Sequence, residues 1–261
     1  MKVAILGPEG TYTHQAAEDY FEDYETVFCP TIREAIYHDS DATVVPFENS
    51  LEGGVMESVD LFKKEDDINI IGEKVLSISH FLVSKEENLE EVEMVKSHPQ
   101  ALAQCRDFIS NHGWKIKETA STSKAASNLG RKEAAIAPRI TAELNDLNIL
   151  KEDIQGNNTN ETRFFILGHN GKTPEKREKT SMILDPGEDR PGLLADILSC
   201  FSENGINLSY IQSRPTKKEL GKYFFFVDVE TDTRSEEFKS TVKCLDNYSD
   251  VKVLGSYKAD K

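Results

Sequence analysis

The residues of this chain best suited to chemistry stand at the entrance to an apolar run. Asn160, Thr162 and Arg163 lead into Phe164–Leu167, a segment of β-forming residues. Arginine offers a carboxylate a planar fork of two hydrogen bonds, and hydroxyl and amide groups add oriented donors. Such a strand entrance suits a small anionic substrate. The alternative is a strand whose first polar residues are simply solvated.

Four more polar clusters follow or flank segments that we predict to be strands. Ligands of open α/β sheets bind at the carboxyl ends of strands, so we expect these clusters to meet around one cleft. Together they offer neutral donors and acceptors, with Arg163 as the one firm cation. The side chains that we select from them are Thr11, Glu48, Asn49, Ser50, Ser97, Gln100, Gln104, Ser121 and Thr122.

Each cluster also has a purely structural alternative. The glycine-rich segment Gly7–Thr13 is accounted for equally well as a tight connection. Asn49, Ser50 and Ser121 are residue types that cap helices, and His98 is a plausible turn residue. The convergence of all the clusters on strand ends favours the functional interpretation.

The cysteines and histidines are dispersed along the chain. Cys29, Cys105, Cys200 and Cys244 form no Cys-x-x-Cys pair. We therefore expect reduced, structural thiols rather than a zinc site or a disulfide framework, and we see no metal site.

Length and composition are those of a soluble globular protein. The 261 residues suffice for two domains, and 38% are hydrophobic and 30% charged. No apolar run approaches the roughly 20 residues that span a bilayer. The apolar stretch of Met1–Gly7 is too short for a signal peptide, so we expect a first β-strand and a cytoplasmic protein. A net charge of −15 argues against nucleic acid and anionic membranes as partners.

Short apolar strands alternate with helical patterns over residues 1–170, which predicts an α/β domain. The segment Ile68–Val83 is long enough to leave one sheet and enter another, and the strand at Arg163 is placed to return. Two such crossings predict two lobes with a cleft. The strands expected are Val3–Leu6, Ala42–Val45, Ile68–Gly72, Val75–Val83, Met94–Lys96, Lys115–Glu118, Ala134–Ala137 and Arg163–Leu167. The helices expected are His14–Phe21, Ile32–His38, Val55–Lys64, Ala101–His112, Lys124–Leu129 and Ile140–Leu147.

A charged segment at His169–Lys179 contains both Gly and Pro and is typical of a linker. A β-α-β-β-α-β series follows, which predicts a ferredoxin-like unit. Its first helix opens at Pro191 and places Leu194, Ile197, Leu198 and Phe201 at helical spacing. Its second helix is capped by Thr233 or Ser235. The strands expected are Ser181–Leu184, Ile206–Gln212, Tyr223–Val229 and Val251–Gly255, and Gly156, Asn157 and Asn158 are expected to form a turn.

These motifs together resemble prephenate dehydratase. The matching segments are GPEGTYTHQAA at 7–17, PFENSLEGG at 46–54, SHPQALAQC at 97–105, STS at 121–123 and NETRFFILG at 160–168. The C-terminal unit resembles the ACT regulatory domain of the same enzymes, through RPGLLADIL at 190–198, NGINL at 204–208 and QSRP at 212–215. The resemblance covers essentially the whole chain in order.

The resemblance implies a bilobed α/β catalytic domain of the type II periplasmic-binding-protein kind. We expect it at residues 1–170, with lobe 1 near 1–75 and 160–170 and lobe 2 near 76–159, followed by an ACT domain at 180–261. The implied reaction converts prephenate to phenylpyruvate, water and carbon dioxide without a cofactor, because aromatisation supplies the driving force. A closely related alternative is an arogenate dehydratase. A more distant alternative is a cytosolic ligand sensor without turnover.

The resemblance also implies roles for single residues. Thr162 is expected to assist the departing hydroxyl, through a relay with a neighbour such as Glu48, and Arg163 to bind a carboxylate. Asn49 completes the catalytic group. The residues expected to orient substrate or line its pocket are Thr11, Ser50, Ser97, Gln100, Gln104, Ser121, Thr122 and Phe164.

The ACT unit implies feedback inhibition by L-phenylalanine, bound between two copies of the domain in a homodimer or homotetramer. The chain departs from the usual family pattern in two places, with Leu193 where alanine is usual and Gln212 where glutamate is usual. These changes are expected either to alter the affinity for phenylalanine or to make another apolar amino acid the regulator. The residues placed around this ligand are Gly192, Leu193, Leu194, Asn207, Leu208, Gln212 and Ser213.

Overall fold

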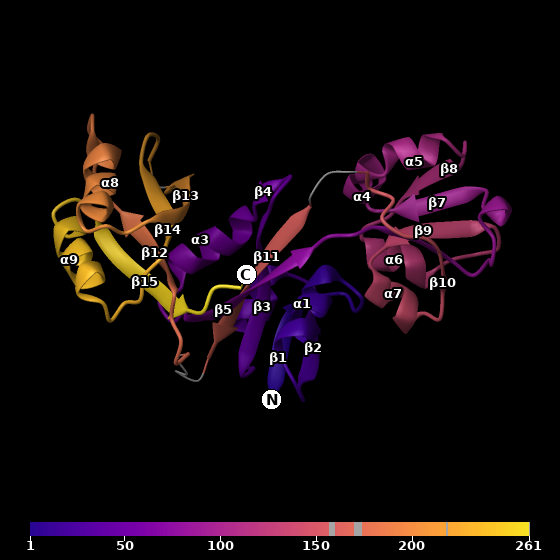
Figure 1. The fold of residues 1–261 in the computed structure, drawn as a ribbon, viewed down its shortest axis with the longest axis horizontal. Coiled ribbons are helices and arrows are strands. Elements are labelled where there is room, and N and C mark those ends of the chain that lie inside the picture. The colour runs from indigo at the N-terminus through magenta and orange to yellow at the C-terminus, as the bar shows by residue number, and fades with distance from the viewer. Residues whose placement is uncertain (157–159, 170–173, 218, 261) are drawn as a thin grey trace. The chain divides into compact units, whose positions relative to one another are not determined.

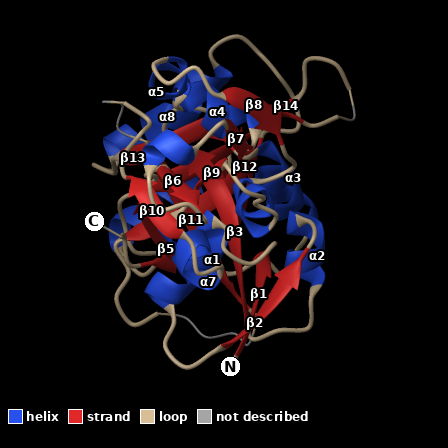
Figure 2. Ribbon diagram, turned by 90° about the vertical axis from the view of Figure 1, so that its right-hand side faces the viewer, coloured by secondary structure: helices blue, strands red, loops and turns tan. Residues whose placement is uncertain are grey.

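The computed structural model describes residues 1–156, 160–169, 174–217 and 219–260. Two compact units are present, and both contain helices and strands (Figures 1 and 2). Unit 1 comprises Met1–Ser40, Val44–Val55 and Lys74–Phe164, and unit 2 comprises Asp41–Thr43, Met56–Glu73 and Phe165–Lys261. Asn157 and Asn158 of the expected turn, and residues 170–173 of the expected linker, lie outside the described residues. In the described part of the chain, no helix is long and apolar enough to span a membrane.

The first sheet has the strand order β2-β1-β3-β11-β5, with β4 beside β3. Its buried centre explains the apolar runs of the sequence, because Val3, Ala4 and Ile5 in β1 are fully buried. The strands are β1 (Lys2–Leu6), β2 (Glu25–Cys29), β3 (Ala42–Asn49), β4 (Gly53–Gly54), β5 (Ile70–Ser77) and β11 (Glu161–Gly168). The helices that connect them are α1 (Tyr12–Tyr20), α2 (Ile32–Tyr37) and α3 (Met56–Lys64).

The second sheet lies in unit 1 and has the order β10-β6-β9-β7-β8. Alternate residues of β9 point to opposite faces, so Ala134 and Ile136 pack with α4 and α5, while Ala135 and Ala137 pack with α6 and α7 (Figure 1). The strands are β6 (Phe81–Ser84), β7 (Met94–Ser97), β8 (Lys115–Glu118), β9 (Glu133–Ala137) and β10 (Asn148–Lys151). The helices are α4 (Pro99–Gln104), α5 (Arg106–Ser110), α6 (Thr122–Ser127) and α7 (Arg139–Leu144), with a 3₁₀ turn, η1, at Leu89–Glu91.

Two chain segments pass between these sheets. Strand β5 belongs to the first sheet and β6 to the second, and the chain returns from β10 to β11. The two crossing segments bond to each other, because Ile78 N–H donates to the Asn160 carbonyl (2.7 Å) and Ile154 N–H donates to the His80 carbonyl (3.1 Å). This is the double crossing that the sequence predicted.

Several predicted boundaries differ from the structure for identifiable reasons. The single helix expected over Ala101–His112 is divided at Cys105, whose backbone angles (φ −102°, ψ 15°) leave the helical range and separate α4 from α5. Strands β2 and β10 were not predicted. Both are edge strands, and their half-exposed side chains give neither a continuous apolar run nor strict alternation.

The C-terminal part of unit 2 is the predicted β-α-β-β-α-β unit. Its antiparallel sheet has the order β13-β14-β12-β15, and α8 and α9 pack on one face (Figure 1). The side chain of Ser235 caps the second helix. The elements are β12 (Lys179–Asp185), α8 (Leu193–Glu203), β13 (Leu208–Pro215), β14 (Tyr223–Val229), α9 (Glu236–Leu245) and β15 (Asp250–Tyr257).

The buried stripe of α8 differs from the predicted one. Ile197 and Phe201 are buried as expected, but Leu194 and Leu198 are 39% and 36% exposed. Leu193 and Cys200 take the inward positions instead. The stripe is rotated by about one residue, which leaves two leucines on the surface of the unit.

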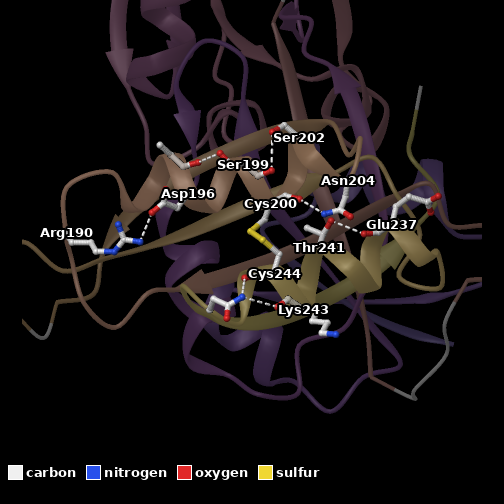
Figure 3. The surroundings of a disulfide bond; sticks show 12 residues. Arg190, Asp196, Ser199, Cys200, Ser202, Asn204, Glu237, Thr241, Lys243 and Cys244 are labelled. Atoms are coloured by element: carbon white, nitrogen blue, oxygen red, sulfur yellow. Dashed lines mark hydrogen bonds and ion pairs between the residues drawn. A yellow bond between two sulfur atoms is a disulfide. The ribbon is translucent and has the colours of Figure 1, made fainter.

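A disulfide bond joins α8 to α9, which corrects the prediction of four reduced cysteines (Figure 3). Cys200 and Cys244 are bonded, with their Cα atoms 5.7 Å apart and a sequence separation of 44. The packing of the two helices brings the sulfur atoms together, and no sequence spacing reveals that packing. Cys29 and Cys105 are free and buried, as predicted.

Within unit 2, α3 and β5 pack against the C-terminal sheet at very short range. A Cβ atom placed on Gly255 of β15 would lie 2.0 Å from the carbonyl oxygen of Ile70 in β5, so only glycine fits. Arg214 forms a two-pronged ion pair with Asp60 of α3 (2.8 and 2.9 Å). Burial alone would raise the pKa of Asp60, but hydrogen bonds from Lys217 and Arg214 outweigh it and lower that pKa.

We expect loss of the Cys200–Cys244 bond to destabilise unit 2. Replacing both cysteines by alanine should lower its free energy of unfolding by about 2–4 kcal/mol, because the cross-link restricts the unfolded chain. Denaturant unfolding with and without dithiothreitol measures the effect. The reductant should shift the wild-type transition and leave that of the double variant unchanged; a wild-type curve insensitive to reductant would contradict the assignment.

Candidate active site

Unit 1 contains a cavity of about 520 Å³, which we call the donor cavity. Its volume is in the range of small-molecule sites. Strand ends and helix starts from both sheets form its wall. The residues lining it are Leu6, Gly7, Thr11, Tyr12, Thr13, Pro46, Asn49, Glu52, Gly53, Gly54, Val55, Ile78, His80, His98, Gln100, Ala101, Gln104, Ala120, Ser121, Thr122, Asn160, Thr162 and Phe164.

The structure brings most of the predicted site residues together and sets four of them apart. Eight of the selected side chains line the donor cavity: Thr11, Asn49, Gln100, Gln104, Ser121, Thr122, Thr162 and Phe164. The four that are not part of its wall are Glu48, Ser50, Ser97 and Arg163.

Arg163 lies on the opposite side of β11 from the cavity. Side chains alternate along a strand, so Thr162 and Phe164 are part of the cavity wall on either side of an arginine that is not. Arg163 is 6% exposed, and its Nε atom lies 3.0 Å from Glu48 Oε1. Its guanidinium also covers the ring of Phe47, 4.6 Å from the ring centre.

The two serines hold strands in place. Ser97 is fully buried and donates to the Ile136 carbonyl oxygen (2.6 Å), which ties β7 to β9. Ser50 accepts the backbone N–H of Glu161 through its hydroxyl (2.9 Å) and donates its own N–H to the Glu161 carbonyl (2.8 Å). These bonds fix the start of β11 against the end of β3.

Backbone N–H groups determine how the Asn49 amide is oriented. Its Oδ1 atom accepts from the N–H groups of Leu51 and Glu52, each at 3.0 Å. Its Nδ2 atom is therefore the donor, to Thr162 Oγ1 (2.9 Å) and to Asn160 Oδ1 (2.6 Å). Asn49, and not Glu48, is thus the side chain that bonds the Thr162 hydroxyl among the described residues.

The Thr162 hydroxyl has a proton left to give. Its oxygen accepts the Asn49 bond, and among the described residues no protein acceptor takes its own proton. Because Thr162 lines the donor cavity, that proton is available to a bound molecule. The hydrogen bond from Asn49 also favours the deprotonated oxygen, since donors stabilise an anion.

His80 and Tyr12 also line the cavity but were not selected from the sequence, and Asn160, which the sequence placed at the strand entrance, lines it too. His80 belongs to none of the motifs, and its position follows from the crossing segment that carries it. Its Nε2 atom lies 2.6 Å from Gln104 Oε1, and its Nδ1 atom lies 3.2 Å from the Tyr12 hydroxyl. Burial lowers the pKa of His80, although the hydrogen bond to Gln104 opposes this change. Burial raises the pKa of Tyr12, so its hydroxyl stays protonated.

The wall of the donor cavity carries little formal charge. Among its described lining residues, Glu52 is the one carboxylate, and neither lysine nor arginine is present. An anion bound here must be held by neutral donors and by the amino end of α1, which Thr11 caps.

A second cavity, of about 590 Å³, lies in unit 2, and we call it the acidic cavity. Of the predicted regulatory residues, Leu193, Leu194 and Ser213 line it, and Gly192 precedes them as the N-cap of α8. Its remaining lining residues are Asp185, Pro186, Gly187, Glu188, Asp189, Thr216, Glu219, Lys222, Tyr223 and Phe225.

The other three predicted regulatory residues are engaged within the unit. Asn207 donates to Glu230 (2.9 Å), and Leu208 packs against the core. Gln212 donates to the carbonyl oxygen of Ser213 (3.0 Å).

Two α/β sheets joined by two crossings around a donor-lined cavity, followed by a β-α-β-β-α-β unit, define a bilobed α/β enzyme with a regulatory domain. The family model for prephenate dehydratase matches residues 3–172, and that for the ACT domain matches residues 185–243. The chain belongs to the prephenate dehydratase family. The family, the fold class and the dehydratase activity predicted from the sequence are thereby confirmed.

Known relatives cover nearly the whole chain. Prephenate dehydratase of Methanocaldococcus jannaschii is 38% identical over 96% of this chain and 95% of the relative. The structure of prephenate dehydratase in complex with L-Phe from Arthrobacter aurescens superposes with a TM-score of 0.89, at 34% identity, and covers 98% of this chain and 90% of that one. Arogenate dehydratase/prephenate dehydratase 2 of Arabidopsis thaliana is 33% identical over 100% of this chain and 73% of the relative.

Proposed function

We propose that the donor cavity binds prephenate and converts it to phenylpyruvate, water and carbon dioxide. The observation that carries this proposal is the Thr162 hydroxyl, which accepts a bond from an oriented amide and keeps its own proton for the cavity. Family membership supplies the reaction. We place the catalytic domain at residues 1–170 and the regulatory domain at 180–261, in keeping with the matched ranges.

In the proposed reaction the bond between the ring and its carboxylate breaks, and the carboxylate leaves as carbon dioxide. The released electron pair moves through the ring and expels the hydroxyl on the opposite ring carbon. Thr162 donates its proton to that oxygen, which leaves as water, and solvent restores the proton to Thr162. The bond from Asn49 stabilises the threonine oxygen while it carries negative charge.

Neutral donors hold the carboxylates in this proposal. Gln104 Nε2 is buried and has no partner among the described residues, and Gln104 lines the cavity. The hydroxyls of Thr11, Ser121 and Thr122 line the same wall. A direct bond from Arg163 to a carboxylate would require the arginine to leave Glu48, so we propose that this ion pair supports β11 instead.

Arogenate is the alternative substrate, and one feature of the cavity suits it. Arogenate carries an ammonium group where prephenate has a keto group, and Glu52 places a carboxylate in the wall. The relative from Arabidopsis bears both dehydratase names. The two substrates are therefore compared directly in the experiment below.

We propose that the acidic cavity binds L-phenylalanine as a feedback inhibitor. Glu188 and Asp189 suit the ammonium group, and Leu193 and Phe225 suit the ring. The protein from Arthrobacter was solved with L-Phe. Phe165, three residues after Thr162 in β11, lies 6.0–6.1 Å ring to ring from Phe226 and Tyr257, and we propose that inhibition acts through β11.

We further propose that two copies associate through the edge of the C-terminal sheet. β13 is an edge strand, and a strand edge is a ready template for pairing. Ile211 on this strand is 43% exposed, and Leu194 and Leu198 on α8 are also exposed. Burial of these apolar side chains would stabilise a homodimer, from which a homotetramer can be built. We also propose a cytoplasmic location for the protein, as expected from the sequence.

Purified protein should convert prephenate to phenylpyruvate, and Thr162→Ala should lower kcat by about a hundredfold or more, the effect usual for a lost proton donor. Phenylpyruvate formation is followed by absorbance, and phenylalanine formation from arogenate by chromatography. Faster turnover of arogenate would assign the chain to the alternative substrate.

Two control variants test the role of the Thr162 proton. Thr162→Ser keeps the hydroxyl and should retain most activity. Asn49→Asp keeps the acceptor for the backbone N–H groups of Leu51 and Glu52 but cannot donate to Thr162, so kcat should fall by about tenfold or more. Near-normal turnover in Thr162→Ala would refute the mechanism.

L-phenylalanine should bind the dialysed protein in calorimetry and lower its turnover of prephenate. Asp189→Asn should weaken binding by about tenfold, the loss expected for one charge-assisted hydrogen bond. Glu203→Gln is the matched control, because it removes an exposed acid of α8 outside the acidic cavity. Equal effects of the two substitutions would place the ligand elsewhere.

Replacing Ile211 by aspartate should dissociate the proposed dimer, because a charge on the paired edge would be buried without a partner. Sedimentation velocity measures the oligomeric state. Ile116→Asp is the matched control, since Ile116 is 56% exposed on β8, an edge strand of the second sheet. Retention of the dimer in Ile211→Asp would exclude this edge as the interface.

A further inference from the structure

The Asn49 amide is the first member of a longer chain of hydrogen bonds through unit 1. Asn49 donates to Asn160 Oδ1 (2.6 Å), and Asn160 Nδ2 lies 3.3 Å from Gln104 Oε1. The same Gln104 oxygen lies 2.6 Å from His80 Nε2, and His80 Nδ1 lies 3.2 Å from the Tyr12 hydroxyl. The chain therefore links β3, both crossing segments, α4 and α1.

The direction of each bond from Asn49 to His80 follows from the first member of the chain. Backbone N–H groups make Asn49 Nδ2 a donor, so Asn160 must accept through Oδ1 and donate through Nδ2. Gln104 then accepts through Oε1. His80 must carry its proton on Nε2 to face that oxygen, which leaves Nδ1 of the neutral ring without a proton. The Tyr12 hydroxyl lies beside Nδ1 (3.2 Å), and its proton is shared between that nitrogen and the Ser79 carbonyl oxygen (2.8 Å).

We propose that His80 is a positioning residue of the dehydratase, which acts through Gln104. By donating to Oε1, the imidazole fixes the amide so that Nε2 has no partner among the described residues and is available to substrate in the cavity. Without that donor, only the longer bond from Asn160 Nδ2 (3.3 Å) holds Oε1, and the amide can rotate and present its oxygen to the cavity. An acceptor at that place repels a carboxylate. The proposal rests on prephenate, or its amino analogue, as the molecule bound there.

The backbone of His80 is already held without its ring. Its N–H donates to Gln155 Oε1 (2.8 Å), and its carbonyl accepts from Ile154 N–H (3.1 Å). The path of the crossing segment therefore does not require the imidazole bond to Gln104. His80 as a whole is 3% exposed, so solvent does not compete for either nitrogen of its ring.

Two substitutions separate the two nitrogens of the ring. The side-chain amide of asparagine occupies about the place of Nδ1 and cannot reach Gln104, whereas the amide of glutamine extends to about the place of Nε2. His80→Asn should lower kcat/KM for prephenate by about tenfold or more, as expected when a substrate-bonding group loses its orientation. His80→Gln should restore kcat/KM to within about threefold of wild type, because it returns a donor to Oε1.

The same substitution in a Gln104→Ala background shows whether His80 acts through Gln104. In that background His80→Asn should have almost no additional effect on kcat/KM, because the group it orients is gone. An undiminished effect in the double variant, or a His80→Gln variant as impaired as His80→Asn, would overturn the proposal. Denaturant unfolding of each variant identifies a loss of activity caused by unfolding, and such a loss would count against the positioning role.

A spectroscopic measurement tests the assignment without turnover. In protein labelled with ¹⁵N-histidine, the His80 ring should show the neutral tautomer with the proton on Nε2, and Gln104→Ala should shift that resonance. A proton found on Nδ1 alone would overturn the bond directions derived above. Turnover of prephenate or arogenate by the wild type is scored separately, and its absence would refute the proposed function. Normal wild-type turnover together with an unimpaired His80→Asn variant would refute only the role of His80.

Discussion

The side-chain amide of Asn49 has one orientation open to it, because two backbone N–H groups already occupy its oxygen. Its nitrogen must then donate, and every neighbouring polar group is assigned its part as donor or acceptor in turn. A turn of backbone after β3 thus specifies the chemistry of side chains on four other elements. In a buried network such a fixed sense matters, since one reversed group would leave two acceptors facing each other.

The fold could be predicted from the sequence wherever apolar burial leaves a periodic pattern. The long segment Ile68–Val83 and the strand at Arg163 were enough to predict the double crossing between sheets. The C-terminal unit was equally readable from its strands and helices. Edge strands β2 and β10 were not, because half-exposed strands have no distinctive pattern. The Cys200–Cys244 bond depends on how two helices pack, which sequence spacing does not encode.

The site could be predicted in composition but only partly in arrangement. Asn49, Gln104 and Thr162 were selected because polar residues at strand ends converge, and they do line one cavity. The side of β11 to which Arg163 points follows from strand alternation once Thr162 is placed in the wall, whereas its charge alone predicted a position inside the cavity. His80 carried no signal, since a histidine in a crossing segment acquires its neighbours only from the tertiary fold.

At Gly255 the backbone of β15 lies so close to Ile70 of β5 that no Cβ atom fits between them. Because the backbones of β15 and β5 meet there with no side chain between them, no change of side-chain rotamer can accommodate a displacement of one strand toward the other. The backbones of β15 and β5 therefore cannot come closer to each other at this point, and β5 is itself paired with β11. Glycine is therefore hard to replace at position 255, because any residue with a Cβ atom would force the two strands apart.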